Sequence, residues 1–599
     1  MKKFTSLLAG VLLSGATVAS LAAETLACRS DSPDDPRPRI GLVLGGGGAR
    51  GVAHISVLKE LERLQVPIDC VAGTSMGSLI GGLYASGMTP AELEEMVTTI
   101  DWMELMDDGI MRQDRSFRRK LDDQKALAPA RPGVGKSGLK LPAGVKTGEK
   151  ILMFLENKTG KAAGVTDFNL LSIPYRAVAT DINTGKAVVI GSGNLATAMR
   201  ASMAIPGAFT PVDIDGKLLV DGGMVNQVPV DVVRAMGADI VIAVDGGTPL
   251  GEIDSTTNLL KIADQVIGFL TVGNTEDTIA ALRKQDILIR PELGSEVSTT
   301  SFEKEKIELA LKIGSEAAAS ASPRFAALSA PSVPARIAPL NRDAETIIAF
   351  IDIDNQTIYN YGIFDSILAP LKGKPIDRRE IEKLFAEIYG QYPLDALTYR
   401  VEHRNGETGL AVQVKPKAIG RTLGEFAMDF SSNQDSQTQF NLTFGLLWSP
   451  VNSNGGEMRG LLTVGDEPGL VGEWYQPLTP GGKYFSNLGA GYQQDLYQFG
   501  DGLDSVVAEY IRNEFFIKPA IGRAFGNWGQ VSLGLDIATG DFERRIGSPA
   551  LPEEKYKIRN AVLDFKIDTL DSLYLPREGI LLDVSLVESV GSWGSTDSF

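Results

Sequence analysis

The apolar positions of this chain change their spacing twice between its N-terminus and its C-terminus. In the first part, apolar runs of strand length alternate with segments whose apolar residues recur every three or four positions. Ile40 to Leu44 is one such run, and Ala49 to Leu64 carries the helical spacing directly after it. Asp69 to Ala72 and Ser78 to Ala85 repeat the same order. Strands that alternate with helices predict an α/β domain, which we place over residues 39–320.

The next part of the chain has a shorter, mixed pattern. Ala317 to Pro339 is dense in Ala, Ser and Pro, including Pro323, which predicts a linker that we place at residues 321–340. A small α+β domain is then expected over residues 341–417. Its predicted strand, two helices and two strands lie, in that order, at Thr346 to Ile353, Gly362 to Leu371, Asp377 to Tyr389, Asp395 to Glu402 and Gly409 to Val414.

Beyond Arg421, apolar and polar residues alternate between turns rich in Gly, Asn, Asp and Pro. This alternation over residues 421–599 predicts antiparallel strands with one apolar and one polar face. Two architectures share it, a soluble β-sandwich and an outer-membrane barrel that turns its apolar face to lipid. The apolar stripes of one parity are Phe440, Leu442, Phe444, Leu446 and Trp448; Val531, Leu533, Leu535 and Ile537; and Leu563, Phe565 and Ile567.

Length and charge limit the classes of function. With 599 residues the chain is too long for one ordinary domain. Its formal net charge of -17 argues against nucleic acid as a partner and against binding to anionic membranes by bulk charge. Contact with a membrane would have to come from local surfaces.

The N-terminus predicts export. Lys2 and Lys3, an apolar stretch around Leu7 to Val18 and the small-residue site Ser20 to Ala22 indicate a secretory signal peptide over residues 1–22. After it, no apolar segment reaches about 18 residues, so no membrane-spanning helix is predicted.

Cysteine usage adds little to this picture. The chain has only Cys28 and Cys70, too few for a disulfide scaffold, and Cys70 is expected in a buried strand. Thr25 to Cys28 faintly resembles a lipoprotein signal. Thr25 is a poor residue for that signal, however, and lipidation is not predicted.

Two glycine-rich turns between the first elements carry the candidate chemistry. Gly45 to Gly51 lies on a strand-to-helix turn, where backbone N–H groups would face an anion. Gly73 to Gly77 has the form G-x-S-x-G and places Ser75 at the apex of a second strand-to-helix turn, as in a nucleophile elbow. Together they predict an oxyanion hole and its nucleophile.

The glycine loop also fits a dinucleotide fingerprint. Gly46, Gly48 and Gly51 have the required spacing, and Asp69 follows at about the distance of a ribose-binding acid. In that fold, however, the acid ends the second strand, whereas Asp69 precedes its strand. Export also disfavours a nicotinamide cofactor, and none is expected.

Further motifs identify a family that this region resembles. Ala179 to Gly185, Ala201 to Phe209 and then Asp221 to Gly223 follow the glycine turns in one order. The set resembles the patatin-like phospholipases, whose pattern is G-G-G-x-R/K-G, G-x-S-x-G and D-G-A/G. The match spans roughly Arg39 to Ser320.

The resemblance implies a mechanism. Ser75 would be the nucleophile and Asp221 the base, with lipid acyl esters as the substrate class and hydrolysis through an acyl-enzyme as the reaction. No metal and no cofactor are implied. The oxyanion hole would be formed by Gly46, Gly47 and Gly48, with Arg50, Gly51, Gly73, Gly77, Gly222 and Gly223 supporting the motifs.

The two histidines favour a Ser-Asp dyad over a triad. His403 lies in a different part of the chain, and His54 falls on the helix behind the glycine loop, where packing or backbone bonding is the expected role. A free Asp, with a pKa of about 3.9, is a weak base at neutral pH. We therefore expect Asp221 to be desolvated, which raises the pKa of a carboxyl group.

Several other polar residues near the motifs are assigned supporting roles. Arg50 has two interpretations, a solubilising charge on a helix face, or a cation that orients the loop or meets a phospholipid head group. Asp181 is predicted in a turn and Ser202 at a helix start, both structural. Met203 and Met224 are expected in the core or the cleft lining.

The second half has its own resemblances. Residues 341–417 resemble a POTRA domain in element order, and Asp568 to Asp571 with Pro576 to Gly579 is similar to a segment of Omp85 and two-partner secretion barrels. The whole chain then resembles a type V d autotransporter. The region from Arg421 allows only about eight to ten strands, and Ser592 to Phe599 lacks the apolar alternation of a closing strand, so a truncated barrel is expected.

Two functions remain open from the sequence. The first is a secreted or surface-displayed phospholipase A-type hydrolase, A1 or A2 undecided, carried by its own outer-membrane translocator. The second is an outer-membrane translocation or assembly channel with a non-catalytic, lipid-binding patatin-like domain. The presence of both Ser75 and Asp221 favours the first. The expected partners are phospholipid and the outer membrane, without nucleic acid, and a homo-oligomer is left open.

Overall fold

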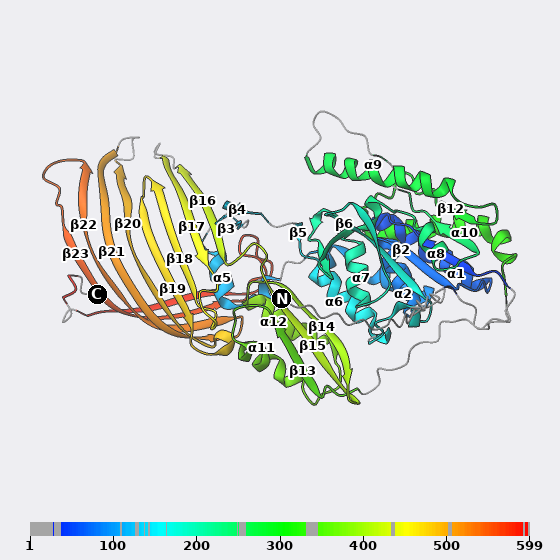
Figure 1. Cartoon of the computed structure of the whole chain (residues 1–599). Coiled ribbons are helices and arrows are strands. Elements are labelled where there is room, and N and C mark those ends of the chain that lie inside the picture. Colours follow the sequence, from blue (N-terminus) through cyan, green and yellow to red (C-terminus); the bar gives the residue numbers. More distant parts are fainter. Residues whose placement is uncertain are drawn as a thin grey trace, which may run out of the picture.

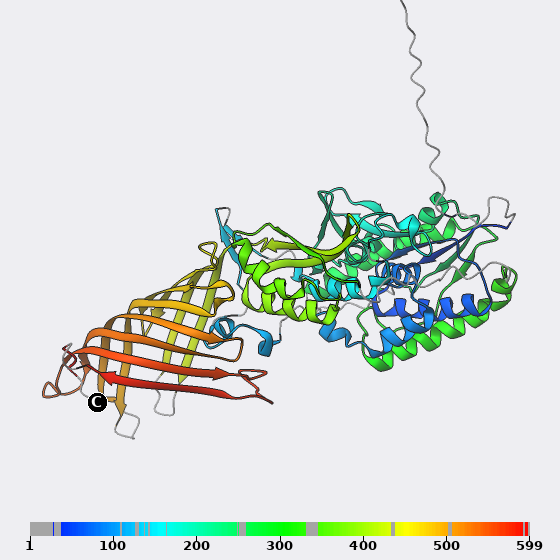
Figure 2. The ribbon, with the colours of Figure 1, turned by 90° about the horizontal axis from the view of Figure 1, so that it is seen from below.

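The protein is described by a computed structural model, in which an α/β body, a small α+β domain and a large curved sheet follow one another (Figures 1 and 2). The predicted signal peptide lies outside the described residues, as do residues 331–340 of the predicted linker. The structure describes residues 28, 37–107, 111–125, 128, 131–136, 138–141, 144–162, 164–247, 250, 259–330, 346–432, 438–500, 506–590 and 594–596.

The body has the α/β architecture that the sequence predicts, and it is built on an eight-stranded sheet. Its strands are β1 (Ile40–Leu44), β2 (Cys70–Thr74), β6 (Tyr175–Asp181), β7 (Lys186–Ile190), β9 (Val212–Ile214), β10 (Lys217–Asp221), β11 (Ile240–Val244) and β12 (Ile287–Ile289). They are ordered β12-β11-β1-β2-β6-β10-β9, with β7 paired to β6. β1 is parallel to both of its neighbours, β2 and β11. Its residue Leu42 lies opposite Val71 of β2 and Ile242 of β11. A strand enclosed in this way needs an uninterrupted apolar sequence, which β1 has.

Helices cover both faces of this sheet. Successive residues of β1 pack into different apolar clusters, Leu42 and Leu44 into one and Val43 into the other. The helices are α1 (Ala53–Arg63), α2 (Met76–Ala85), α3 (Pro90–Thr99), α4 (Trp102–Leu105), α6 (Glu149–Lys158), α7 (Leu195–Ser202), α8 (Val230–Ala235), α9 (Leu259–Ala280) and α10 (Lys304–Ala326), with 3-10 turns η1 (Gly48–Val52), η3 (Gly160–Ala162), η4 (Phe168–Leu170) and η5 (Gly222–Met224).

The end of α10 corrects the predicted linker. The helix continues to Ala326, six residues into the range 321–340. Pro323 suggested a break, but it lies in the last turn of the helix, and the alanine-rich sequence before it favours helix. Phe325 is fully buried in the core of the α/β body. The linker prediction is therefore wrong for residues 321–326.

The start of the α/β body is fixed by a disulfide and an ion pair that were not predicted. Cys28 and Cys70 form a disulfide, which joins the segment before β1 to the first residue of β2. The guanidinium of Arg37 donates to both carboxylate oxygens of Asp69, at 2.7 Å each. Asp69 also accepts the N–H of Ile40 at 2.7 Å. Asp69 therefore anchors strand β1, a structural role unlike that of a ribose-binding acid.

The small α+β domain has the predicted order of strand, two helices and two strands. Its sheet runs β13-β15-β14, with β13 parallel to β15. The first strand begins at Phe350 rather than Thr346, since Ile347 makes only an isolated bridge. The elements are β13 (Phe350–Asn355), α11 (Tyr361–Leu368), η6 (Ala369–Leu371), α12 (Arg378–Gln391), β14 (Leu394–Arg404) and β15 (Glu407–Pro416).

The C-terminal region is one antiparallel sheet, as the alternation predicts. Its strands are β16 (Thr422–Ser432), β17 (Thr438–Trp448), β18 (Glu457–Gly465), β19 (Gly469–Pro477), β20 (Tyr484–Gly500), β21 (Val506–Phe525), β22 (Gly529–Ile546), β23 (Lys555–Asp568) and β24 (Leu581–Ser589), with η7 (Pro480–Gly482). Neighbours in sequence are neighbours in the sheet. Phe444 and Leu446 are about half exposed, whereas Asn441, Glu425 and Arg459 on the other face are buried. The apolar face of the sheet is the open one.

Part of the predicted hydrolase region lies against this C-terminal sheet. It contains η2 (Arg112–Asp114), α5 (Phe117–Asp123), β3 (Gly133–Gly135) and β4 (Gly138–Lys140). β3 extends the sheet by pairing with β16, where Gly133 lies opposite Leu423. The chain then returns through β5 (Gly144–Lys146), which pairs with β8 (Gly207–Phe209) of the α/β body. The range 39–320 is therefore interrupted in space, which local sequence patterns could not indicate.

Candidate active site

Ser75 occupies the tight turn between β2 and α2. Its φ of 53° and ψ of -124° are angles that a non-glycine residue rarely adopts, as expected for a nucleophile elbow. The flanking glycines provide the space for this turn. A Cβ on Gly73 would collide with the carbonyl of Gly77, and a Cβ on Gly77 would collide with the carbonyl of Leu44.

Asp221 ends β10 and lies beside this turn. Its carboxylate accepts the N–H of Gly223 at 2.8 Å, and an interaction with the hydroxyl of Ser75 acts to lower the pKa of this carboxyl group. The backbone is fixed as well, because the Asp221 N–H donates to the carbonyl of Ala204 and its own carbonyl accepts the hydroxyl of Thr180, both at 2.9 Å. The structure therefore brings the two predicted catalytic residues together, because Gly222 after Asp221 lies against Thr74 before Ser75.

Burial makes Asp221 a stronger base than a free aspartate. Ser75 and Asp221 are only 7% and 8% exposed. Desolvation raises the pKa of Asp221 to about 6, although the hydrogen bonds from Ser75 and Gly223 act to lower it. The carboxylate is thus still ionised at neutral pH but has a higher affinity for a proton.

The glycine loop offers two of its three predicted N–H donors. The N–H of Gly46 donates to the carbonyl of Gln227 at 3.1 Å and is not available to a substrate here. Gly47 and Gly48 have φ angles of 143° and 56°. Among the described residues, no hydrogen-bond acceptor is found for their two N–H groups. Gly48 is also held against Thr299, whose carbonyl accepts the N–H of Ala49 at 2.9 Å.

Arg50 fastens the glycine loop from behind. Its side chain donates to the carbonyls of Gly246 and Gly247 at 2.9 and 2.7 Å, and to those of Gly294 and Val297 at 2.8 and 2.6 Å. The residue is 4% exposed. Of the two interpretations of the sequence, orientation of the loop agrees with these contacts, whereas a solubilising charge does not.

His54 is buried beneath the same loop. One ring nitrogen, Nε2, lies 2.8 Å from the carbonyl of Gly45. Burial lowers the pKa of His54 to about 4, so the ring is neutral at neutral pH and donates this hydrogen bond. The backbone-bonding role expected for His54 agrees with this geometry.

Ser202 is closer to the site than the sequence suggested. It was expected at a helix start but is the last residue of α7. Its hydroxyl accepts the N–H of Ser75 at 2.9 Å and donates to the carbonyl of Val178 at 2.6 Å. Ser202 thus positions the strained turn, and only its place within the motif Ala201 to Phe209 hinted at this role.

The remaining predicted residues have packing roles. A Cβ on Gly51 would meet the side chain of Met76 at 2.6 Å, and one on Gly222 would meet the carbonyl of Val178. The carboxylate of Asp181 accepts from Asn183 and Thr184, as expected in a turn. Met203 packs partly buried against the core, and Met224 is also partly buried.

Helix α9 borders the site and presents apolar side chains outward. Asn274 donates to the carbonyl of Gly223 at 2.9 Å, and its side-chain oxygen accepts the N–H of Gln227 at 2.9 Å. These bonds fix α9 next to Asp221. On the same helix, Phe269 and Leu270 are 55% and 47% exposed.

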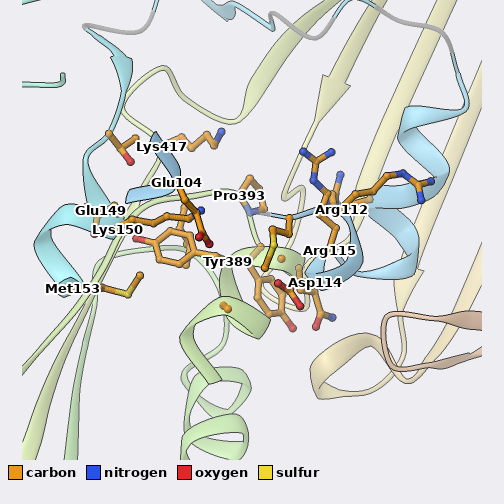
Figure 3. A pocket seen from close by; sticks show the side chains of 18 of the residues that line it. Glu104, Arg112, Asp114, Arg115, Glu149, Lys150, Met153, Tyr389, Pro393 and Lys417 are labelled. Atoms are coloured by element: carbon orange, nitrogen blue, oxygen red, sulfur yellow. The ribbon is translucent and has the colours of Figure 1, made fainter. Parts of the chain in front are cut away.

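A cavity of about 1730 Å³ lies elsewhere, and Ser75 and Asp221 do not line it. It is an open cavity, lined in part by η2, α5, α6, α12 and β16. Figure 3 shows Arg112, Asp114 and Arg115 on one side of it, and Lys150 on another. No group of three or more His, Cys, Asp or Glu suited to a metal ion occurs among the described residues. Among the helices that the structure describes, none has the length and apolar character needed to cross a membrane.

Comparison with known proteins gives a match for one domain of this chain. The family model of the patatin-like phospholipases matches residues 42–234. An uncharacterized NTE family protein of Mycobacterium tuberculosis is 37% identical over 207 residues, which cover 35% of this chain and 49% of that protein. The chain thus spans about half the length of that relative.

Other relatives match stretches of similar length. Human patatin-like phospholipase domain-containing protein 6 is 35% identical over 240 residues, covering 38% of this chain and 14% of that protein. Lysophospholipase NTE1 of Mycosarcoma maydis is 36% identical over 219 residues, covering 36% of this chain and 10% of the relative.

Likenesses to solved structures are distant. BamA from Haemophilus ducreyi lacking POTRA domains 1–3 has a TM-score of 0.34 at 9% identity, covering 42% of this chain and 49% of that chain. VipD from Legionella pneumophila has a TM-score of 0.28 at 17% identity, covering 47% and 66%. Scores of this size do not establish a shared fold. The sequence comparisons therefore identify residues 42–234 of this chain as similar to the patatin-like phospholipase domain.

Proposed function

We propose that the chain is an exported serine acyl hydrolase that cleaves phospholipid acyl esters with a Ser75–Asp221 dyad. The observation that carries this proposal is a strained, buried serine beside a buried aspartate whose pKa is raised to about 6. The N–H groups of Gly47 and Gly48, which have no acceptor among the residues that the structure describes, would serve as the oxyanion donors that such a dyad needs. The match to lysophospholipase NTE1 supports a lipid substrate.

The reaction follows from these positions. Asp221 takes the hydroxyl proton of Ser75 as its oxygen attacks the ester carbonyl, and Gly47 and Gly48 donate to the resulting oxyanion. Collapse of this intermediate breaks the ester bond, and protonated Asp221 gives its proton to the leaving alcohol. A water molecule then attacks the acyl-enzyme while Asp221 accepts the water proton. Asp221 passes this proton to the oxygen of Ser75 as the fatty acid leaves, which restores the serine hydroxyl and the carboxylate.

The outward apolar residues of α9 support substrate delivery from a lipid surface. Phe269 and Leu270 project from a helix that is hydrogen-bonded to the loop beside Asp221. Apolar residues exposed on one helix face favour insertion at a membrane interface. A phospholipid would then reach Ser75 by a short path.

We further propose that residues 421–599 anchor the chain in an outer membrane. The support is that the apolar face of the sheet is the exposed one. Apolar residues such as Phe444 and Leu533 are exposed, whereas the charged residues Glu425 and Arg459 are buried. The element order of the small domain supports a POTRA-like role for it. The disulfide between Cys28 and Cys70 supports export, because disulfides persist in oxidising compartments.

The test is product analysis with matched serine variants. The full chain in detergent is incubated with phospholipid vesicles, and fatty acid and lysophospholipid are quantified by mass spectrometry. Ser75→Ala should lose product formation, and the exposed Ser320→Ala of α10 should keep it. Lipids labelled on one acyl chain separate A1 from A2 specificity. Product formation by Ser75→Ala within about tenfold of the parent would contradict the proposal.

A further inference from the structure

A charged segment of the N-terminal region enters the concave face of the C-terminal sheet. We name residues 112–125 the docking segment, which contains η2 and α5. Both views show α5 at the end of the curved sheet, apart from the body that contains α1 and α2 (Figures 1 and 2). Its start is fixed by the N–H of Ser116, which donates to the carbonyl of Gly390 in α12 at 3.0 Å.

On one side, cations of the docking segment meet two glutamates of the sheet. Arg118 donates to Glu457 of β18 at 3.1 Å and to Glu473 of β19 at 2.7 Å. Arg119 also pairs with Glu457, and Lys125 pairs with Glu473 at 2.6 Å. Glu457 is 3% exposed, so the docking segment replaces water as the partner of its carboxylate.

A second contact has the opposite signs. Arg459 of β18 pairs with Asp122 of α5 at 2.8 Å and with Glu425 of β16 at 2.9 Å. Burial acts to raise the pKa of Asp122, but the surrounding cations outweigh it and hold that pKa well below its usual range. The charges of helix and sheet are therefore complementary in both directions.

A third contact reaches strands on the far side of the sheet. Arg112 donates to both carboxylate oxygens of Asp568 at 2.5 Å. Lys120 is 1% exposed, and its ammonium donates to the carbonyls of Asn527 and Asp568 at 2.7 and 3.0 Å. Asp568 ends β23, five strands from β18. In a flat sheet with about 4.8 Å between strands, these strands would be roughly 24 Å apart, so the sheet must curve around α5.

We propose that the docking segment is an ionic latch that fastens the hydrolase domain to the concave face of the C-terminal sheet. Without it, Glu425, Glu457, Glu473 and Asp568 would share this face with Arg459. Arg131, which lies outside the docking segment, would still pair with Glu425 at 3.2 Å, but the other three carboxylates would lose the cations just described. Buried like charges of this kind repel one another and lack compensation. The concave face is thus built to receive a cationic helix, and its partner is residues 112–125 of the same chain. This inference does not depend on the catalytic assignment.

Protection from trypsin measures the latch, because the segment contains six cleavable cations. In the full chain in detergent, cleavage after Arg115 and Lys125 is followed by mass spectrometry. Glu457→Lys combined with Glu473→Lys should accelerate these two cleavages by about tenfold or more, since cleavage follows the population of the undocked state. The matched control is Glu543→Lys with Glu554→Lys, at exposed positions in and beside β22 with the same charge change. Equal rates in both double variants would overturn the latch.

A charge swap separates docking from misfolding. Arg118→Glu and Arg119→Glu are added to Glu457→Lys and Glu473→Lys, which reverses the sign of these two arginines and of both glutamates. Lys125 keeps its charge, so the cleavage sites at Arg115 and Lys125 stay in place. The swap should restore most of the protection. If the quadruple variant is cleaved as fast as the double variant while its circular dichroism still reports the β-sheet, the ionic complementarity proposed here is wrong.

Discussion

The raised pKa of Asp221 determines how the rate of Ser75 acylation falls at acidic pH, which is the acid limb of the pH–rate profile. With a pKa of about 6, the carboxylate is almost fully ionised at pH 8 but only about one-eleventh ionised at pH 5. An aspartate at the ordinary value of 3.8 would still be more than about nine-tenths ionised at pH 5. The rate of Ser75 acylation should therefore fall about elevenfold between pH 8 and pH 5.

A fluorophosphonate that labels Ser75 measures this limb without lipid transfer. The second-order labelling rate is recorded from pH 5 to pH 8 for the parent, His54→Gln and Asp221→Asn. His54 has a pKa of about 4 and its ring bonds to Gly45, so His54→Gln should keep both the limb and most of the rate. Asp221→Asn should label slowly at every pH. A rate that is flat down to pH 5, or a limb that vanishes in His54→Gln, would refute the dyad.

Four further predictions concern the same contacts. Ser75→Ala should abolish phospholipid hydrolysis and leave the circular dichroism spectrum unchanged, because it removes only one hydroxyl group; a folded variant that still hydrolyses phospholipid would contradict the assignment of Ser75. Asp221→Asn should have a free energy of unfolding up to about 3 kcal/mol higher than the parent at pH 8, because the ionised carboxylate of Asp221 is disfavoured in the folded state, where its pKa is raised. This difference should disappear below about pH 4, where Asp221 is protonated in both states, and thermal unfolding at both pH values measures it. Arg50→Lys should destabilise the α/β body by at least about 2 kcal/mol, because an ammonium cannot reach four carbonyls on two loops; equal melting temperatures would contradict this. A fragment of residues 421–599 should sediment with outer membranes, and a soluble, monomeric, β-rich fragment would contradict membrane anchoring.

The local features of the fold were accessible from the sequence, because they depend on short-range spacing. The run Ile40 to Leu44 predicts β1 to the residue, and the glycine motifs place Ser75 on its turn. Gly46 shows the limit of a motif. It has the expected position, yet its N–H is taken by Gln227, which lies far along the chain.

The features that the sequence did not reveal all depend on long-range contacts. Ser202 holds the N–H of Ser75 across 127 residues, and Arg118 meets Glu457 across 339. Neither pair has a spacing that a local pattern reports. Pro323 misled for the opposite reason, since a helix breaker was weighed without knowing that Phe325 is buried in the core.

The ionic contacts of α5 also bear on the choice between a β-sandwich and a membrane barrel. In a sandwich, the apolar face of the sheet, which includes Phe444, would turn inward. The charged face, which includes Glu457 and Arg459, would face water. The described sheet has the reverse arrangement, and the buried charges find their partners on a helix from the N-terminal region. An apolar face left open over so many strands would be a strong aggregation hazard in water. A lipid environment removes that hazard, so the polar contacts of the concave face support the proposal that the opposite face lies against a membrane.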